Sequence, residues 1–247
     1  MNSALRILDG EFPAQLQARS ILSAIGHGER TMKSISNATS IQASNLARPV
    51  SVLIEAKRVV HAQEPLSGAR LHAPRYSVAD PYLKFWLRFV ERELPAIERI
   101  RTEEVVDRIL AQWASARGRL VEPIIRGALQ RRLPDDRLPG AAHVGGYWTR
   151  TNEPEVDLIG ADGPTAPASV AFIGSIKWRT SAPFDSGDLE QLIRMGALVP
   201  GVGPSTLLIA VSRQGVEPSA RKLDLEATAE ELVALDPSAS PSVPARK

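Results

Sequence analysis

The chain of 247 residues contains no cysteine. Disulfides, thiolate metal sites and cysteine nucleophiles are therefore excluded, and this composition fits a reducing compartment, so we expect a cytoplasmic protein. No apolar run reaches the roughly 18–20 residues that a bilayer-spanning helix needs. Residues 1–12 also lack the basic and then apolar order of a secretory signal. We therefore expect no association with a membrane.

A phosphate-binding loop is also missing. The pattern G-x-x-x-x-G-K-[ST] does not occur, and the Gly-rich stretch 199–205 (VPGVGPS) has no lysine. We therefore expect that the chain by itself neither binds nor hydrolyses ATP. The formal net charge is only +2, so any nucleic-acid-binding surface has to be local.

The N-terminal part has the element order of a winged helix-turn-helix, which we predict over residues 1–79. Apolar residues recur at helical spacing over residues 15–25, Thr31 is suited to cap a short second helix, and a third helical pattern follows Ile41. Two short strand patterns then occupy KRVVHAQEP and RYSVAD. In a winged helix the N-terminal residues of the third helix meet base edges in the major groove.

Candidate DNA-binding residues follow from that geometry. We expect basic residues of the wing to touch phosphates. Pro49 should bend the third helix near its start, because it removes one backbone donor. A protein-binding winged helix, or a simple three-helix packing module, is the alternative. The candidates are Gln42, Ser44, Asn45 and Arg48 in the third helix, and Arg70 and Arg75 in the wing.

We predict connecting helices over residues 80–117. The aromatic residues of DPYLKFWLRFV, such as Phe85, Trp86 and Phe89, have a spacing that is more typical of core packing than of a ligand platform. The helical pattern over residues 105–133 contains Gly118 and Pro123, which should split it into two helices.

The remaining pattern predicts a small α/β (α+β) domain over residues 118–215. Three strands (HVGGYWTR, EVDLIGA and SVAFIGSIKW) are followed by a helix (DLEQLIRMGALV) and a buried strand (STLLIAVS). We expect a mixed central sheet. Residues 216–247 are polar and end in a Pro-, Ser- and Ala-rich stretch, so we expect a disordered tail.

One group of polar residues in this domain has the chemistry of a phosphodiesterase site. Asp157 lies in the second strand, Ser175 and Lys177 end the third strand on one side of it, and Glu122 lies in the preceding helix. Carboxylates hold Mg²⁺, which activates water, and a nearby lysine stabilises the oxyanion. On spacing alone, a simple cross-strand pair between Asp157 and Lys177 is the better interpretation.

Several stretches together resemble the C-terminal region of a prokaryotic family of predicted ATPases that carry a domain of unknown function. These stretches are ILSAIGHGERTMKSIS, RYSVADPYLKFWLRFV, RGRLVEPIIRGAL, GGYWTRTNEPEVDLIG and FIGSIKW. The resemblance implies a restriction-endonuclease-like domain of the PD-(D/E)XK superfamily. It also implies that Glu122, Asp157 and Lys177 correspond to the helix glutamate, the motif aspartate and the motif lysine.

Two departures from the family bear on function. Where the family usually has Glu-Cys-Lys-Trp, this chain has Ser175-Ile176-Lys177-Trp178, so a neutral hydroxyl replaces a metal-binding carboxylate. The family's N-terminal P-loop ATPase domain is also missing. We therefore expect a fragment, a degraded gene product, or a partner of a separately encoded P-loop ATPase.

Three functional hypotheses remain. The first is a DNA-binding or regulatory module on a nuclease-like scaffold with a degraded metal site. The second is a Mg²⁺-dependent DNA endonuclease with catalytic Glu122, Asp157 and Lys177, in which Asp157, Glu122 and Ser175 hold the metal. The third is a protein-interaction subunit of an ATPase that makes no DNA contact. Because Ser175 lacks the carboxylate, we place the first ahead of the other two.

Overall fold

The computed structural model describes residues 17–66, 73–99, 102–151, 153–164, 169–220, 222–228 and 231–232. Contacts divide the chain into two compact units. The first comprises Met1–Glu64 and Ala73–Ser115, and the second comprises Pro65–His72 and Ala116–Lys247. Helix α7 (Thr102–Arg132) therefore contributes its first part to one unit and its second part to the other. The helices that follow residue 80 group with the N-terminal unit.

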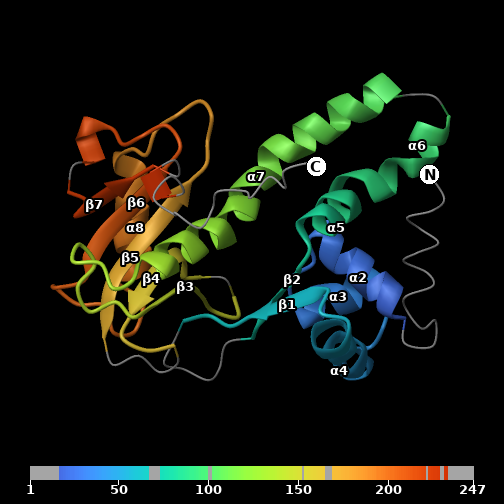
Figure 1. Cartoon of the computed structure of the whole chain (residues 1–247), viewed down its shortest axis with the longest axis horizontal. Coiled ribbons are helices and arrows are strands. Elements are labelled where there is room, and N and C mark those ends of the chain that lie inside the picture. The colour runs from blue at the N-terminus through green and yellow to red at the C-terminus, as the bar shows by residue number, and fades with distance from the viewer. Residues whose placement is uncertain are drawn as a thin grey trace, which may run out of the picture. The chain divides into compact units, whose positions relative to one another are not determined.

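From residue 17 onwards, the described part of the first unit starts with three helices and continues into a two-stranded antiparallel sheet (Figure 1). Thr31 accepts a hydrogen bond from the backbone N–H of Ser34 and caps the second helix, as its sequence predicts. The third helix continues through Pro49 and then changes to a π-helical turn. The elements are α2 (Ala18–His27), α3 (Met32–Thr39), α4 (Ala43–Ser51), η2 (Val52–Ala56), β1 (Val60–Gln63) and β2 (Arg75–Val78).

Short helical segments close the first unit. They are α5 (Pro81–Phe85), η3 (Trp86–Val90), η4 (Glu91–Glu93) and α6 (Leu94–Glu98). Trp86 and Phe89 are buried in this unit, whereas Phe85 remains 40% exposed, so the expected aromatic core is only partly formed by these residues. Gly26 of α2 lies against Leu87, where an added Cβ would come within 2.4 Å of the Leu87 Cβ. The absence of a side chain at residue 26 therefore allows α2 and η3 to pack closely.

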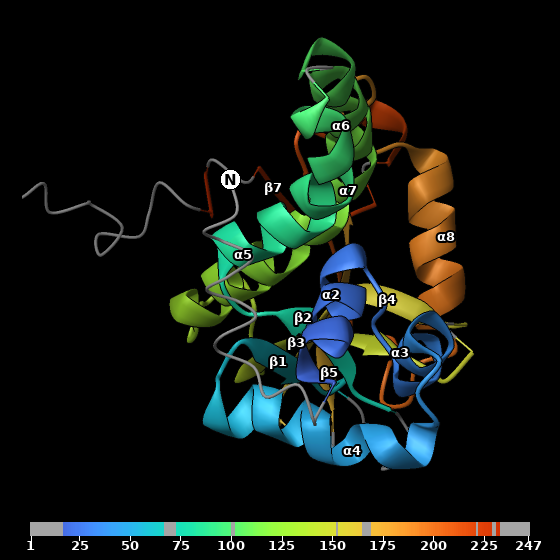
Figure 2. The same ribbon diagram turned by 90° about the vertical axis from the view of Figure 1, so that its right-hand side faces the viewer.

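The second unit has a five-stranded mixed sheet, which confirms the predicted α/β class. Its order is β3-β4-β5-β6-β7; the first three strands are antiparallel and the last three parallel. Figure 2 shows α8 on the side of the sheet away from α7. The elements are β3 (His143–Trp148), β4 (Glu155–Ala161), β5 (Val170–Lys177), α8 (Ser186–Gly196), β6 (Leu207–Ser212), η5 (Pro218–Ala220) and β7 (Leu225–Ala227).

Each face of this sheet has its own apolar core. Ile125 and Leu129 of α7 pack with Leu158 and Phe172 on one face, and Leu192 of α8 packs with residues of the other face. Because the apolar positions on both sides of Pro123 stay in one helical register, α7 runs without interruption, and the predicted break at Gly118 and Pro123 is wrong. None of the described helices is long and apolar enough to cross a membrane.

The C-terminal residues differ from the expected tail. Within the stretch after residue 216, η5 and β7 are formed, and β7 pairs in parallel with β6. Ala220 is fully buried, and the Asp224 carboxylate accepts a hydrogen bond from the backbone N–H of Leu208 at 2.7 Å. These contacts order a polar stretch whose composition alone suggests disorder. Residues 233–247 lie outside the described part of the chain.

A carboxylate at the centre of the first unit joins η4 to α2. Glu91 accepts hydrogen bonds from Arg19 and Ser23, and His27 Nε2 lies 3.1 Å from its Oε2. Arg19, Ser23 and His27 are four residues apart, so they share one face of α2. Burial by itself would raise the pKa of Glu91, but the nearby His27 and the hydrogen bonds from Ser23 and Arg19 lower that pKa to about 2.

We predict that Glu91 makes the stability of the protein depend on pH. Because the pKa is lowered from 4.5 to about 2 in the folded state, its stabilising effect is complete above pH 4.5 and is lost as the pH falls towards 2. With allowance for solvent screening, Glu91→Gln should lower the free energy of unfolding at neutral pH by about 2 kcal/mol. Urea unfolding at several pH values measures both effects.

The exposed Glu103 at the start of α7 provides the control for this experiment. Glu103→Gln should stay within about 0.5 kcal/mol of the wild type at every pH. A Glu91→Gln variant that kept the acid dependence of the wild type between pH 4.5 and 2 would contradict the assignment.

Candidate functional site

A β-bulge in β4 positions Asp157. The β3–β4 pairs Gly145↔Ile159 and Tyr147↔Val156 enclose one residue of β3 but two residues of β4. Asp157 and Leu158 thus lie opposite Gly146, which is the arrangement of a bulge. Bulges redirect side chains and are frequent next to functional sites.

The carboxylate of Asp157 is bound by two donors from β5. Regular pairing of β4 with β5 runs from Gly160↔Phe172 to Leu158↔Gly174. Past that point Asp157 Oδ2 accepts hydrogen bonds from the backbone N–H of Ile176 at 2.9 Å and from Ser175 Oγ at 3.1 Å. The side chain of Asp157 therefore takes the place of a backbone acceptor. Ser175, 8% exposed, is satisfied by the same oxygen.

Lys177 is held by a residue of α8. Its Nζ lies 3.2 Å from Asp188 Oδ1, and Arg179 donates to the other oxygen of Asp188. Asp188 also belongs to the capping box of α8, because its backbone N–H donates to Asp185 Oδ1 at 2.9 Å and its carboxylate accepts from the N–H of Asp185. The D-x-x-D spacing before the helical pattern is the sequence signal by which Asp188 could have been found.

The third predicted residue, Glu122, has a cationic partner of its own. Arg126, one turn further along α7, donates from Nη2 to Glu122 Oε2 at 3.0 Å. The same guanidinium donates from Nε to the backbone carbonyl of Asp157 at 2.7 Å. The structure thus connects Glu122 to the bulge through Arg126.

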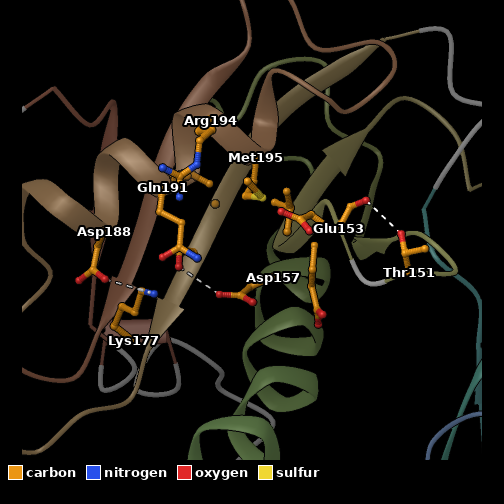
Figure 3. Close-up of a pocket in the computed structure, with 13 residues that line it drawn as sticks. Thr151, Glu153, Asp157, Lys177, Asp188, Gln191, Arg194 and Met195 are labelled. Carbon is orange, nitrogen blue, oxygen red and sulfur yellow. Dashed lines mark hydrogen bonds and ion pairs between the residues drawn. The ribbon is translucent and has the colours of Figure 1, made fainter.

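Asp157, Ser175 and Lys177 line one cavity of about 460 Å³ between the end of the sheet and α8 (Figure 3). The charges around it are four carboxylates and two cations, so the lining is net acidic. Glu122 is not one of the lining residues. The charged residues of the lining are Glu153, Glu155, Asp157 and Asp188, with Lys177 and Arg194.

The residues present do not fit the Mg²⁺ site that the resemblance implies. Among the described residues, no three His, Asp or Glu side chains are grouped closely enough to hold a metal ion. Magnesium binds through hard oxygen ligands, chiefly carboxylates. Here Ser175 offers a hydroxyl that already donates to Asp157, and Glu122 is paired with Arg126. The arrangement is a set of internal charge and hydrogen-bond pairs.

The structure also places the predicted DNA-contacting residues. Leu46 and Val50 of α4 are buried in the core of the first unit, while the other side of its N-terminal part is exposed. Arg75 of β2 is only 7% exposed, so the phosphate contact expected of it is not supported, and Arg70 lies outside the described residues. The exposed residues at the start of α4 are Gln42, Ser44, Asn45 and Arg48.

We predict that Asp157 stabilises the fold whether or not a metal is present. Asp157→Ala removes the acceptor of the Ile176 N–H and of the buried Ser175 hydroxyl, which should cost about 2–4 kcal/mol of unfolding free energy. Asp157→Asn keeps one acceptor oxygen and should cost about 1 kcal/mol. Urea unfolding in the presence of a chelator provides the measurement.

The exposed Glu153 lines the same cavity and is the matched control for the loss of a carboxylate. Glu153→Ala should leave the stability within about 0.5 kcal/mol of the wild type. If Asp157→Ala were as stable as Glu153→Ala, the carboxylate would have no structural role, as expected for a residue kept only to bind metal.

The comparisons with known proteins match part of the chain to a family. No curated protein and no solved structure matches it significantly. A family model does match residues 86–189, a span that includes Asp157, Lys177 and Asp188. That family, DUF234, is described as archaeal and bacterial proteins of unknown function.

Proposed function

We propose that this protein is a DNA-binding module in which α4 contacts the duplex and the nuclease-like second unit does not cleave it. The observation that carries the proposal is the two-sided character of α4. Its Leu46 and Val50 are buried, while Gln42, Asn45 and Arg48 are exposed. A recognition helix needs such a division, because one side has to be fixed in the core and the other has to reach base edges.

The first turn of α4 has further properties that suit a phosphate contact. Its N-cap residue, Gln42, makes no side-chain hydrogen bond to the helix, and the first turn contains no acidic residue. The N–H groups at a helix N-terminus carry a partial positive charge that favours anions. The amide and hydroxyl groups of Asn45 and Ser44 add donors and acceptors for base edges or phosphates.

The internal pairs of the second unit support a non-catalytic role. Asp157, Lys177 and Glu122 each have a partner inside the protein. The acidic lining of the cavity would repel a DNA phosphate in the absence of a bound cation. The Mg²⁺-dependent endonuclease remains an alternative that needs a complete carboxylate set, and Ser175 and Arg126 both count against it.

We predict that Arg48→Ala weakens binding to duplex DNA. Loss of one phosphate-directed cation should lower the affinity severalfold and reduce the slope of log K against log salt by about 1. Fluorescence anisotropy with a labelled duplex, titrated at several salt concentrations, measures both quantities.

Arg92→Ala is the control, because Arg92 of η4 is also an exposed arginine of the first unit but lies outside α4. It should retain the affinity and salt slope of the wild type. Equal losses in the two variants would assign the binding to general positive charge. Absence of any duplex binding at low salt would refute the proposal as a whole.

A stripe of exposed apolar residues favours a second candidate, a subunit that binds another protein. Val106, Leu110 and Trp113 of α7 are 48%, 59% and 40% exposed. Their spacing of four and three residues places them on one face of the helix. The resemblance to predicted ATPases suggests a separately encoded P-loop ATPase as the partner. In that case the first unit would bind the ATPase.

We predict that Leu110→Glu abolishes binding to such an ATPase without unfolding the protein, because Leu110 is exposed and a charge there disfavours an apolar interface. Ala111→Glu introduces the same charge at an exposed neighbouring position off the stripe and should leave binding intact. Sedimentation of the purified pair measures the complex. If both variants bind as well as the wild type, the stripe is not the interface.

A further inference from the structure

We propose that Arg126 holds Glu122 in an internal ion pair and thereby prevents this carboxylate from serving as a metal ligand. This proposal rests on the nuclease-like interpretation of the second unit, and it is independent of DNA binding by α4. Two features distinguish this chain from the site that the resemblance implies. Ser175 stands in place of a carboxylate, and Glu122 binds the guanidinium of Arg126.

Arg126 is a largely buried positive charge that is paired within the protein. Its side chain is 8% exposed, and that of its partner Glu122 is 14% exposed. Two nitrogens of the guanidinium are used, Nη2 on Glu122 Oε2 at 3.0 Å and Nε on the Asp157 carbonyl at 2.7 Å. An arginine side chain stays protonated at all physiological pH values, so this positive charge cannot be withdrawn.

Two backbone features make room for the guanidinium. The bulge in β4 lies opposite Gly146, and the Asp157 carbonyl in that bulge accepts the bond from Nε. An added Cβ at Gly146 would lie 2.9 Å from Arg126 Nη2 and 3.0 Å from its Cζ. Any other residue at position 146 would therefore displace the guanidinium. Arg126 is four residues after Glu122, so both side chains leave the same face of α7.

The pair between Glu122 and Arg126 determines which substitutions would create a metal-binding site. A divalent cation that recruited Glu122 would have to break the pair with Arg126 and would then lie near an unpaired positive charge. Ser175→Glu alone supplies the missing carboxylate but leaves this obstacle in place. We therefore expect Ser175→Glu to bind divalent metal no better than the wild type, and removal of the charge at residue 126 to change that.

Mn²⁺ binding tests the proposal, with the signal of free aqueous Mn²⁺ in electron paramagnetic resonance as the readout. The Ser175→Glu, Arg126→Gln double variant should bind one Mn²⁺ at least roughly tenfold more tightly than Ser175→Glu alone. The glutamine side chain would keep an amide donor for the Asp157 carbonyl but carry no charge. Arg126→Lys in the same background keeps the charge and should bind Mn²⁺ no better than Ser175→Glu alone.

Arg119→Gln in the Ser175→Glu background is the matched control. Arg119 is an arginine of the same helix, and the hydrogen bonds described above join Glu122 and the Asp157 carbonyl to Arg126 instead. The proposal is overturned if Ser175→Glu alone binds Mn²⁺ as tightly as the double variant with Arg126→Gln, or if the Arg126→Lys variant does so. It is also overturned if the folded Arg126→Gln double variant shows no gain in affinity, because Arg126 is then not the obstacle.

Thermal unfolding establishes which variants are folded. If Arg126→Gln prevents folding, Arg126→Met in the Ser175→Glu background provides a second route, since methionine fills part of the space of the arginine side chain and carries no charge. The same gain in Mn²⁺ affinity is expected, and its absence would overturn the proposal. DNA is not part of this readout, so failure of the metal test and failure of DNA binding by α4 remain distinguishable.

Discussion

The second unit depends on the point at which β4 stops pairing with β5. At the bulge the backbone of β4 no longer follows the register of the sheet, and the carboxylate of Asp157 accepts the N–H of Ile176 that would otherwise lack a partner. On the same residue the backbone carbonyl accepts from Arg126. One residue therefore fixes the end of β5 through its side chain and the orientation of α7 through its main chain. The Asp157 carboxylate is thereby tied to β5 through its Oδ2 atom.

The charged residues around that point form two separate sets of pairs. Lys177 binds Asp188, Asp188 closes the capping box of α8, and Glu122 binds Arg126. Removal of one member of a buried pair is costly, because its partner is left charged and desolvated. Asp157, Lys177 and Glu122 therefore each have a structural role in the second unit.

Local signals in the sequence were sufficient for most of the fold. The Thr31 cap, the three strand runs after residue 141 and the helix at residues 186–196 depend on neighbours in the chain, so patterns predicted them. The continuity of α7 was missed because Pro123 is a strong local signal, and packing on the sheet outweighs it. The stretch that forms β7 was missed for the opposite reason, since pairing with β6 orders a segment of low apolar content.

The candidate site was predicted only in part, for a related physical reason. Asp157, Ser175 and Lys177 lie on adjacent strands, and the alternation of side chains on a strand was enough to bring them together. The partner of each charged side chain depends on the distances between side chains of different helices and strands. Arg126 and Asp188 carry no distinguishing pattern beyond helical spacing and a capping box, so their roles became visible only when α7 and α8 were placed against the sheet.

The proposed separation of roles between the two units rests on charge and burial. The cavity at the end of the sheet is lined by four carboxylates and two cations, and in nucleases a metal ion compensates for such acidity. Under the proposed function, Ser175 and the pairing of Glu122 with Arg126 leave this acidity without a compensating metal ion, and the cavity would repel a polyanion. The exposed polar start of α4 has no acidic residue in its first turn and no side-chain cap. The proposed contact with DNA is therefore placed at α4, where it does not require a metal.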